Sequence, residues 1–390
     1  MADPKQVVFP IGAAVCVLAL LYKLWDLRLG RRDPSLIALL VTFFCKGISF
    51  ALGTPAVSAW VDEQIGVPDI AILINHLLGG VVASTAMLVA AVFWVHPTQQ
   101  ARPRAGIYMA AASVFALALI VLWIADFTPG HARATHYLVQ HADRPLGAAY
   151  LLVYVTAFGA EMIEVVRLSV RYARQSSQVW LRRGLRVAAA GAAAYLVFCL
   201  HRAIAILAVH LGLRPLDWEF VTSLSTGIGV ILFAAGLTMP SWGPRLSALH
   251  ALVKEYLACA QLYPLWRALL QAAPEIALTH SMPRTRLADW LTLRDVSYRL
   301  YRRVIEIQDG RHALRAYLPL HPPVQAEGHG LSAERWLAAV EASRLKAAIT
   351  AKACSERPRL GEGDELTAPC GDDYDDEVRW LVDLARAFNT

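Results

Sequence analysis

Charged and polar side chains lie inside long apolar segments of this sequence, at depths that bring several of them into one layer. At 1.5 Å per helical residue, Lys46 lies about 18 Å above one end of its segment, and His201 and Arg202 lie about 20 to 24 Å along theirs. Asn75 and His76 enter their segment from the opposite side, to a depth of about 10 Å. Charge at such a depth is costly unless it faces protein or water, so this layer indicates a functional site.

The chemistry that this layer predicts is the binding of a small anionic or zwitterionic solute. Lys46 and Arg202 would supply fixed positive charge to a polar pocket in the outer half of a helical bundle. The residues predicted to bind the ligand are Lys46, Asn75, His76, His201, Arg202, Glu219 and Thr222. The alternative is structural: Lys46 extends toward the interface, and Arg202 pairs with Glu219 as a packing contact.

Two carboxylates three residues apart, Glu161 and Glu164, form a second feature on one helical face. Such a pair can hold a divalent cation or relay protons, as a membrane enzyme acting on a lipid-linked phosphate would need. Arg167 and Arg171 follow at helical spacing and can neutralise Glu164 instead. We therefore favour an intrahelical ion pair, and predict no catalytic residue, metal site or cofactor.

Three histidines, His131, His136 and His141, are spaced five residues apart in a segment rich in Pro, Gly and Arg. Steps of five do not stack on one helical face. The spacing therefore predicts an exposed, solvated loop, with metal binding or pH sensing as the alternative.

The composition identifies the elements that must position these residues. Of 390 residues, 56% are hydrophobic and 17% are charged, whereas a soluble globular chain carries about 25% charged residues. This excludes a simple soluble enzyme and a disordered chain, and the six cysteines show no disulfide or zinc spacing. Seven stretches are long enough to span a bilayer: Val7–Leu24, Pro34–Leu52, Ile70–Val95, Gly106–Ala125, Ala148–Leu168, Val187–Leu211 and Phe220–Met239.

The loops between these stretches alternate in charge, which predicts the topology. The second loop carries Asp62, Glu63 and Asp69 without Lys or Arg. The basic loops carry Arg28, Arg31 and Arg32; Arg102 and Arg104; and Arg171, Arg174, Arg182, Arg183 and Arg186. Basic loops stay cytoplasmic, so the N-terminus is expected outside and the C-terminus inside.

Residues 241–390 predict a different kind of domain. The formal net charge of +6 belongs to residues 1–240, because the remainder carries equal numbers of each sign. Pro240 and Pro244 are expected to end the last span, and the apolar periodicity then predicts helices over 246–262, 293–307, 332–352 and 372–388. Gly310 is expected to cap the second of them. The fold class is therefore an all-α integral membrane protein, with a seven-helix transmembrane bundle (1–240) followed by a small all-helical cytosolic domain (241–390).

One cytosolic motif resembles a known family. The motif consists of the runs Tyr263-Pro264-Leu265-Trp266-Arg267-Ala268-Leu269 and Leu300-Tyr301-Arg302-Arg303-Val304-Ile305-Glu306-Ile307-Gln308-Asp309-Gly310, with Pro274-Glu275 between them. It is similar to a family of actinobacterial multispan membrane proteins catalogued as candidate transporters, with a C-terminal domain of unknown function. The resemblance implies a bacterial cell-membrane protein, but no substrate and no catalytic residue.

Within that motif, Trp266, Arg302, Arg303, Glu306 and Asp309 are the residues of interest. We interpret the four charged ones as an ion network between helices, with simple surface pairing as the alternative.

The leading functional hypothesis is a transporter that handles the solute of the outer pocket. The alternative is a membrane receptor or regulator that signals through the cytosolic domain to a protein partner. A membrane enzyme built on Glu161 and Glu164 ranks third. The expected partners are the lipid bilayer, a small solute and a cytosolic protein. No nucleic acid is expected, because the positive charge lies in the loops of the membrane part, where it sets the orientation of the helices.

Overall fold

The computed structural model describes residues 5–28, 33–127, 137–213, 219–277, 294–319, 332–358 and 373–390. Within these ranges the ordered elements are helices, and no strand is present. The chain divides into two compact units, Met1–Pro244 and Arg245–Thr390. Each unit has its own apolar core.

Seven helices of the described chain are long and apolar enough to cross a membrane, which confirms the seven predicted segments. Six of them are α1 (Lys5–Arg28), α2 (Pro34–Gly53), α6 (Thr98–Asp126), α8 (Pro145–Gln175), α9 (Val179–His210) and α10 (Glu219–Ala272). The seventh, Ile70–Val95, consists of α4 (Ile70–Asn75), η1 (His76–Val82) and α5 (Ala83–Val95). Two short helices, α3 (Pro55–Ile65) and α7 (Tyr137–Ala142), join spans.

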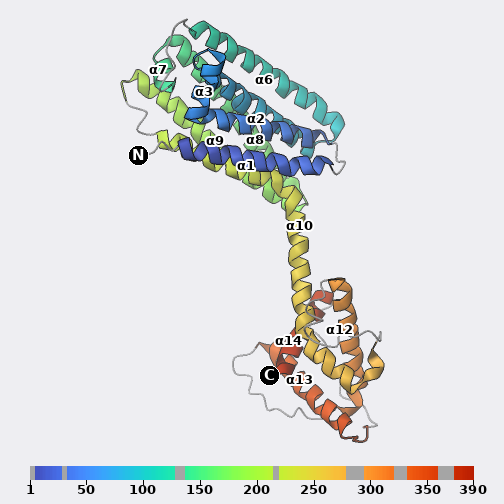
Figure 1. Cartoon of the computed structure of the whole chain (residues 1–390). Coiled ribbons are helices and arrows are strands. Elements are labelled where there is room, and N and C mark those ends of the chain that lie inside the picture. The colour runs from blue at the N-terminus through green and yellow to red at the C-terminus, as the bar shows by residue number, and fades with distance from the viewer. Residues whose placement is uncertain are drawn as a thin grey trace. The chain divides into compact units, whose positions relative to one another are not determined.

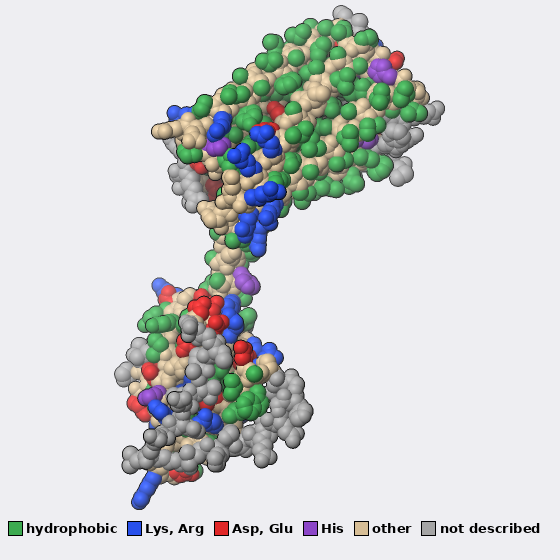
Figure 2. Space-filling model, turned by 180° about the vertical axis from the view of Figure 1, so that it is seen from behind, with side chains coloured by type: hydrophobic (Ala, Val, Ile, Leu, Met, Phe, Trp, Pro, Cys, Tyr) green, Lys and Arg blue, Asp and Glu red, His purple; other side chains and the backbone are tan. Residues whose placement is uncertain are grey.

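The surface of the first unit suits a lipid environment. Large apolar side chains cover its sides, while Lys and Arg gather toward one end (Figure 2). Leu18, Ile107 and Val114 are examples, with 67 or 68% of their surface exposed. Exposed apolar surface on this scale is unusual for a soluble monomer. The chain is therefore compatible with a multi-pass membrane protein, while the membrane, the organism and the side that holds the C-terminus stay predictions.

The bundle is held together by small residues on facing helices. α1 packs beside α2, and α8 packs between α6 and α9, with α3 and α7 at the end where the chain begins (Figure 1). On α9 and α10 the backbones approach closely: a Cβ added at Gly236 would lie 2.5 Å from the Ala188 nitrogen. Within the run of small residues from Ala188 to Ala194, the buried Ala188, Gly191 and Ala192 form the packing face toward α10, as small residues allow.

The third span contains a π-helical segment that the apolar pattern does not reveal. In η1 the hydrogen bonds connect residues five apart, as from the Ala83 N–H to the Leu78 carbonyl. Gly79 and Gly80 lie inside this segment. Short π segments within α-helices occur frequently at functional sites, because they widen the turn and redirect the carbonyls.

The helix that contains the last span does not end at Pro240 and Pro244, the two prolines that we expect to mark the exit from the span. α10 continues through Pro240 and Pro244 to Ala272, although each interior proline removes a backbone hydrogen bond at a cost of about 3 kcal/mol. Packing offsets this cost: the Trp242 ring lies 5.7 Å from the Trp180 ring of α9, and Gly243 lies against the same ring.

The second unit is built from the end of α10, α12 (Val296–Ala313), α13 (Ala333–Ala353) and α14 (Tyr374–Asn389), with short turns η3 (Pro274–Ile276) and η4 (Arg315–Tyr317). Its core joins Leu269, Ile307, Leu345 and Leu384. Gly310 is not a cap, because α12 runs on past it. It lies inside the helix, where a Cβ would be only 3.0 Å from the Leu269 Cβ.

Replacing Gly236 by alanine is expected to destabilise the bundle. The added methyl group meets the α9 backbone, which cannot rotate away as a side chain can, so the cost should be about 1 to 3 kcal/mol. Gly106→Ala is the matched control, because nothing lies within 4 Å of its Cβ position. Thermal unfolding of the purified protein in detergent should show a lowered midpoint for Gly236→Ala alone. Equal midpoints for the two variants would contradict the close helix contact.

Candidate functional site

A cavity of about 240 Å³ lies in the first unit, at the end that carries α7. Six of the seven residues predicted to bind a ligand line it: Lys46, Asn75, His76, Arg202, Glu219 and Thr222. They come from four of the long apolar helices: α2, the third span, α9 and α10. The structure thus brings the predicted polar layer together, and the role of these residues in binding stays a prediction.

Lys46 is held by a backbone carbonyl and two aromatic rings. Its Nζ donates a 2.8 Å hydrogen bond to the Gly79 carbonyl of the π segment. The ammonium also lies 4.8 Å from the centre of the Phe158 ring and 4.6 Å from that of Tyr195. Cations are attracted to aromatic faces at such distances. The Lys46 side chain therefore points to groups inside the bundle, and not toward the membrane–water interface as in the alternative.

The π segment also shapes the wall beside Lys46. A side chain at Gly79 would overlap Ser49 of α2, and one at Gly80 would overlap the Tyr154 ring. Ser49 Oγ donates to Asn75 Oδ1 across the same gap. The two glycines therefore allow Ser49 of α2 and Tyr154 of α8 to pack directly against the backbone of η1. At Gly79, that backbone forms part of the cavity wall.

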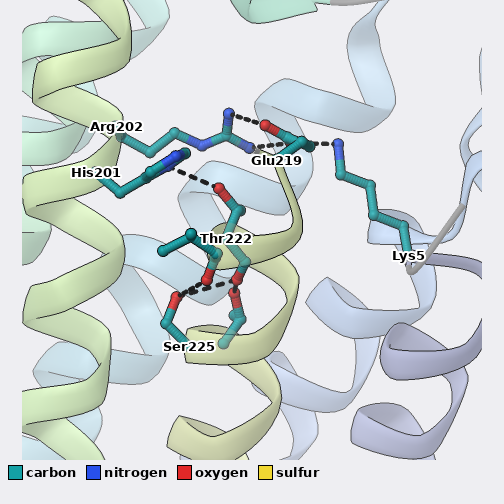
Figure 3. Close-up of polar contacts among 8 residues, drawn as sticks. Lys5, His201, Arg202, Glu219, Thr222 and Ser225 are labelled. Atoms are coloured by element: carbon teal, nitrogen blue, oxygen red, sulfur yellow. Dashed lines mark hydrogen bonds and ion pairs between the residues drawn. The ribbon is translucent and has the colours of Figure 1, made fainter. Parts of the chain in front are cut away.

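Arg202 and Glu219 form a bidentate ion pair, with Nη1 to Oε2 at 3.1 Å and Nη2 to Oε1 at 2.9 Å (Figure 3). Lys5 completes the group, because its Nζ lies 2.6 Å from Glu219 Oε1. The predicted pairing of Arg202 with Glu219 is thus present, and it lines the cavity. Lys5 was missed, because it precedes the first apolar segment and no spacing connects it with Glu219.

His201 is the one predicted ligand-binding residue that does not line the cavity, but it contacts Thr222, which does. Its Nδ1 is 3.0 Å from Thr222 Oγ1 (Figure 3). Thr226, one turn further along α10, donates to the Thr222 carbonyl and also lines the cavity. This arrangement fixes the Thr222 hydroxyl at the wall.

His76 is part of an aromatic cluster that sequence reasoning did not identify. Its Nδ1 is 2.8 Å from the Tyr150 hydroxyl, and its ring stacks on Tyr154 with 3.9 Å between ring centres. Tyr154 and Tyr195 line the cavity beside it. Tyr195 is 1% exposed, and its hydroxyl has no hydrogen-bond partner among the described residues.

The cavity has an excess of positive charge. Its described lining carries the cations Lys5, Lys46 and Arg202 against the single carboxylate of Glu219. Glu219 already pairs with Lys5 and Arg202, so the Lys46 ammonium has no carboxylate partner in the lining itself, although the charge of Glu161 outside the lining acts on it. A small guest with a carboxylate or a similar anionic group would complete the balance, because buried charges are stable when they are paired.

The acidic pair Glu161 and Glu164 does not form one site. Glu161 Oε1 accepts a 2.7 Å hydrogen bond from Thr85 of α5. Glu164 instead accepts from the Tyr108 hydroxyl of α6 at 2.8 Å, and pairs with Arg167 at 3.2 Å. The ion pair that we favoured is present. The described residues contain no group of three His, Cys, Asp or Glu side chains that could hold a metal ion.

The prediction of an exposed histidine loop is wrong for His141. It is 7% exposed and lies between two carboxylates, with Nδ1 at 2.6 Å from Asp126 Oδ2 and Nε2 at 3.8 Å from Asp69 Oδ2. Tyr137 stacks on its ring and also lines the cavity. Burial alone would lower the pKa of His141, but the hydrogen bonds and charges of Asp69 and Asp126 outweigh it and raise the pKa. His131 and His136 lie outside the described residues.

In the second unit, the predicted motif packs α12 against α10. Trp266 Nε1 donates to Glu306 Oε2 at 2.5 Å, and Arg302 Nε lies 3.4 Å from Glu306 Oε1. Arg303 is buried, donates to the Cys259 carbonyl and stacks on Trp266. Asp309 is exposed. Four of the five motif residues therefore hold the fold of this unit together.

A second buried ion network was missed by the sequence reasoning. Glu341 is 0% exposed and pairs with Arg311 at 2.9 Å and with Arg344 at 3.6 Å. Arg311 also lies over the Trp380 ring of α14. These contacts join α12, α13 and α14, and nothing in the spacing of the three residues predicts them.

A family of unknown function (DUF6545) matches residues 251–390. No curated protein and no solved structure matches the chain. The family description agrees with the expected C-terminal domain of unknown function and gives no activity, source or transport role.

The His141 contacts predict a pH dependence of stability. A raised pKa means that the folded chain holds this proton more tightly than the unfolded chain, whose pKa is 6.5. The stabilisation is therefore complete below that pH and is lost as the pH rises through the raised value. His141→Asn should be less stable than wild type by about 2 kcal/mol at pH 6, and the difference should shrink by pH 9.

Thermal unfolding in detergent across this pH range measures the effect, and His312→Asn, at an exposed position, is the control. A difference between wild type and His141→Asn that does not change with pH would show that His141 is not held as a cation.

Proposed function

We propose that this chain is a membrane transporter that binds a small anionic or zwitterionic solute in the cavity of its first unit. The observation that carries the proposal is the placement of Lys46 in the cavity wall, with its ammonium satisfied by one carbonyl and two aromatic rings. An ammonium inside the bundle that donates to a carbonyl rather than to a carboxylate is electrostatically suited to an anionic guest. We place the protein in the cell membrane, with the second unit in the cytoplasm, because of the charges of its loops. Its placement in a bacterium rests on the resemblance of the cytosolic motif alone.

The size and lining of the cavity support a small guest. About 240 Å³ lies just below the range usual for drug-sized ligands and suits a solute of amino-acid size. The aromatic rings of Tyr154, Phe158 and Tyr195 offer apolar contacts. Asn75 and Thr222 offer groups that can orient the polar end of a solute.

The π segment supports movement of the solute rather than binding alone. Transporters often place their sites where a spanning helix departs from regular α geometry, because such segments change their hydrogen bonds at low cost. η1 departs from that geometry at the wall beside Lys46. A shift of η1 to α geometry would move the Gly79 carbonyl, release Lys46 and change the cavity.

Ligand binding can be tested with the full chain in nanodiscs. A panel of amino acids and small carboxylates is screened for compounds that raise the unfolding temperature, and the dissociation constant of the best compound is measured. Lys46→Met should weaken its binding about 10- to 100-fold, which is the loss of one charged contact. Lys254→Met removes the same charge from an exposed pair with Asp375 and should leave binding unchanged. Equal affinity of the two variants, or stabilisation by none of the compounds, would contradict the proposal.

Transport is tested separately, in proteoliposomes. The compound that binds is supplied in labelled form, and its concentration-dependent uptake is compared with that of vesicles containing Lys46→Met. Saturable uptake that is lost in the variant is expected. Binding without any flux in either direction would eliminate the transporter.

The second candidate, a receptor, is favoured by one observation. α10 carries Thr222 and Thr226 of the cavity wall, and the same helix carries Trp266 and Leu269 of the core of the second unit. A guest that shifts the first turns of α10 would act on a helix that both units use. Binding without flux, together with altered hydrogen exchange in α12 and α14, would support this reading instead.

A further inference from the structure

The part of α10 that belongs to the second unit carries an apolar face that is not packed against other described residues. Between Pro244 and Lys254 every side chain is exposed. The face, called here the leucine stripe, consists of Leu246, Leu249, Leu252, Val253 and Leu257, with 45 to 56% of each residue exposed. Five large apolar residues within 12 positions are more than the scattered exposure that a protein surface usually shows.

The spacing of the stripe is that of a coiled-coil seam. Within the stripe, Leu246, Leu249 and Val253 follow one another at intervals of three and four residues, and the half-buried Tyr256, outside the stripe, continues the pattern three residues later. This is the a and d pattern of two supercoiled helices, with Leu at one d position and Val at one a position. At 100° per residue, the stripe covers an arc of about 140° on one side of the helix.

The polar face of the same stretch is already used within the unit. Lys254 Nζ donates to Asp375 of α14 at 3.0 Å, and Glu255 accepts from Ser297 of α12 at 2.5 Å. These contacts orient the helix, so that its polar face turns toward α12 and α14. The leucine stripe is thereby directed away from the unit that carries it.

We infer that the leucine stripe is the contact surface for a second copy of this chain, paired in parallel. Two copies inserted in one membrane share orientation and depth, so their α10 helices present the same residues at the same level. A two-fold axis along the helices then brings Leu249 against Leu249 and Val253 against Val253. This inference rests on the proposed membrane placement and is independent of solute binding.

Disulfide crosslinking of the full chain in native membranes tests the pairing. The background variant carries Cys354→Ser and Cys370→Ser, because Cys354 is exposed and Cys370 lies outside the described residues. Single cysteines are then introduced as Leu249→Cys and Val253→Cys on the stripe. Ala251→Cys is the matched control, because Ala251 is exposed on the opposite face.

Crosslinking should follow the stripe, with about five times more dimer at Leu249→Cys and Val253→Cys than at Ala251→Cys. Equal crosslinking at the three positions, or none at any, would overturn the inference. No crosslinking at any of the three positions is the result expected if lipid or a different protein covers the stripe.

A second measurement does not depend on cysteine chemistry. Native mass spectrometry of the purified full chain should give twice the mass of one chain. The double variant Leu249→Asp/Val253→Asp should give the mass of one chain, and Ala251→Asp should keep the dimer. These positions are exposed, so an unchanged unfolding midpoint verifies that the variants are folded. A wild-type chain that is monomeric, or a dimer that survives the double variant, would overturn the inference.

Discussion

A lysine ammonium inside an apolar bundle must find its electrostatic partners within the protein, and the candidate site depends on how Lys46 does so. Its Nζ bonds to the Gly79 carbonyl, which η1 presents because its hydrogen bonds connect residues five apart. The remaining directions face the rings of Phe158 and Tyr195. These contacts stabilise the positive charge without a direct ion pair. The described lining of the cavity therefore carries more cationic than anionic side chains.

Close packing of helices in the rest of the bundle positions the other charged residues of the cavity. Small residues of α9 and α10 bring their backbones together, which places His201 and Arg202 beside the first turns of α10. Arg202 and Lys5 then neutralise Glu219, so that the carboxylate does not compete with a guest for Lys46. The second unit uses charge differently: Glu306 and Glu341 are buried and fully paired with arginines, and they hold its helices in place.

The sequence predicts the features that depend on composition and regular spacing. Seven apolar helices, the layer that contains Lys46 and Arg202, and the Arg167–Glu164 pair all follow from hydropathy and helical period. The π segment does not, because it depends on how Gly79 meets Ser49 on another helix. The continuation of α10 through Pro240 depends on tertiary packing by Trp180, and the burial of His141 depends on Asp69 and Asp126, which lie on two other segments. Each of these is a contact between distant segments, which local patterns do not encode.

The most direct test of this account is the hydrogen bond between Lys46 and Gly79. Carbonyl carbon-13 NMR of the chain labelled at Gly79, in nanodiscs, compares wild type with Lys46→Met, and Gly106, which has no neighbour within 4 Å of its Cβ position, is the reference. The account predicts an upfield shift of the Gly79 signal on loss of the ammonium, with Gly106 unchanged. A Gly79 signal that is the same in both proteins would contradict it, because Lys46 would then not be held by the π segment.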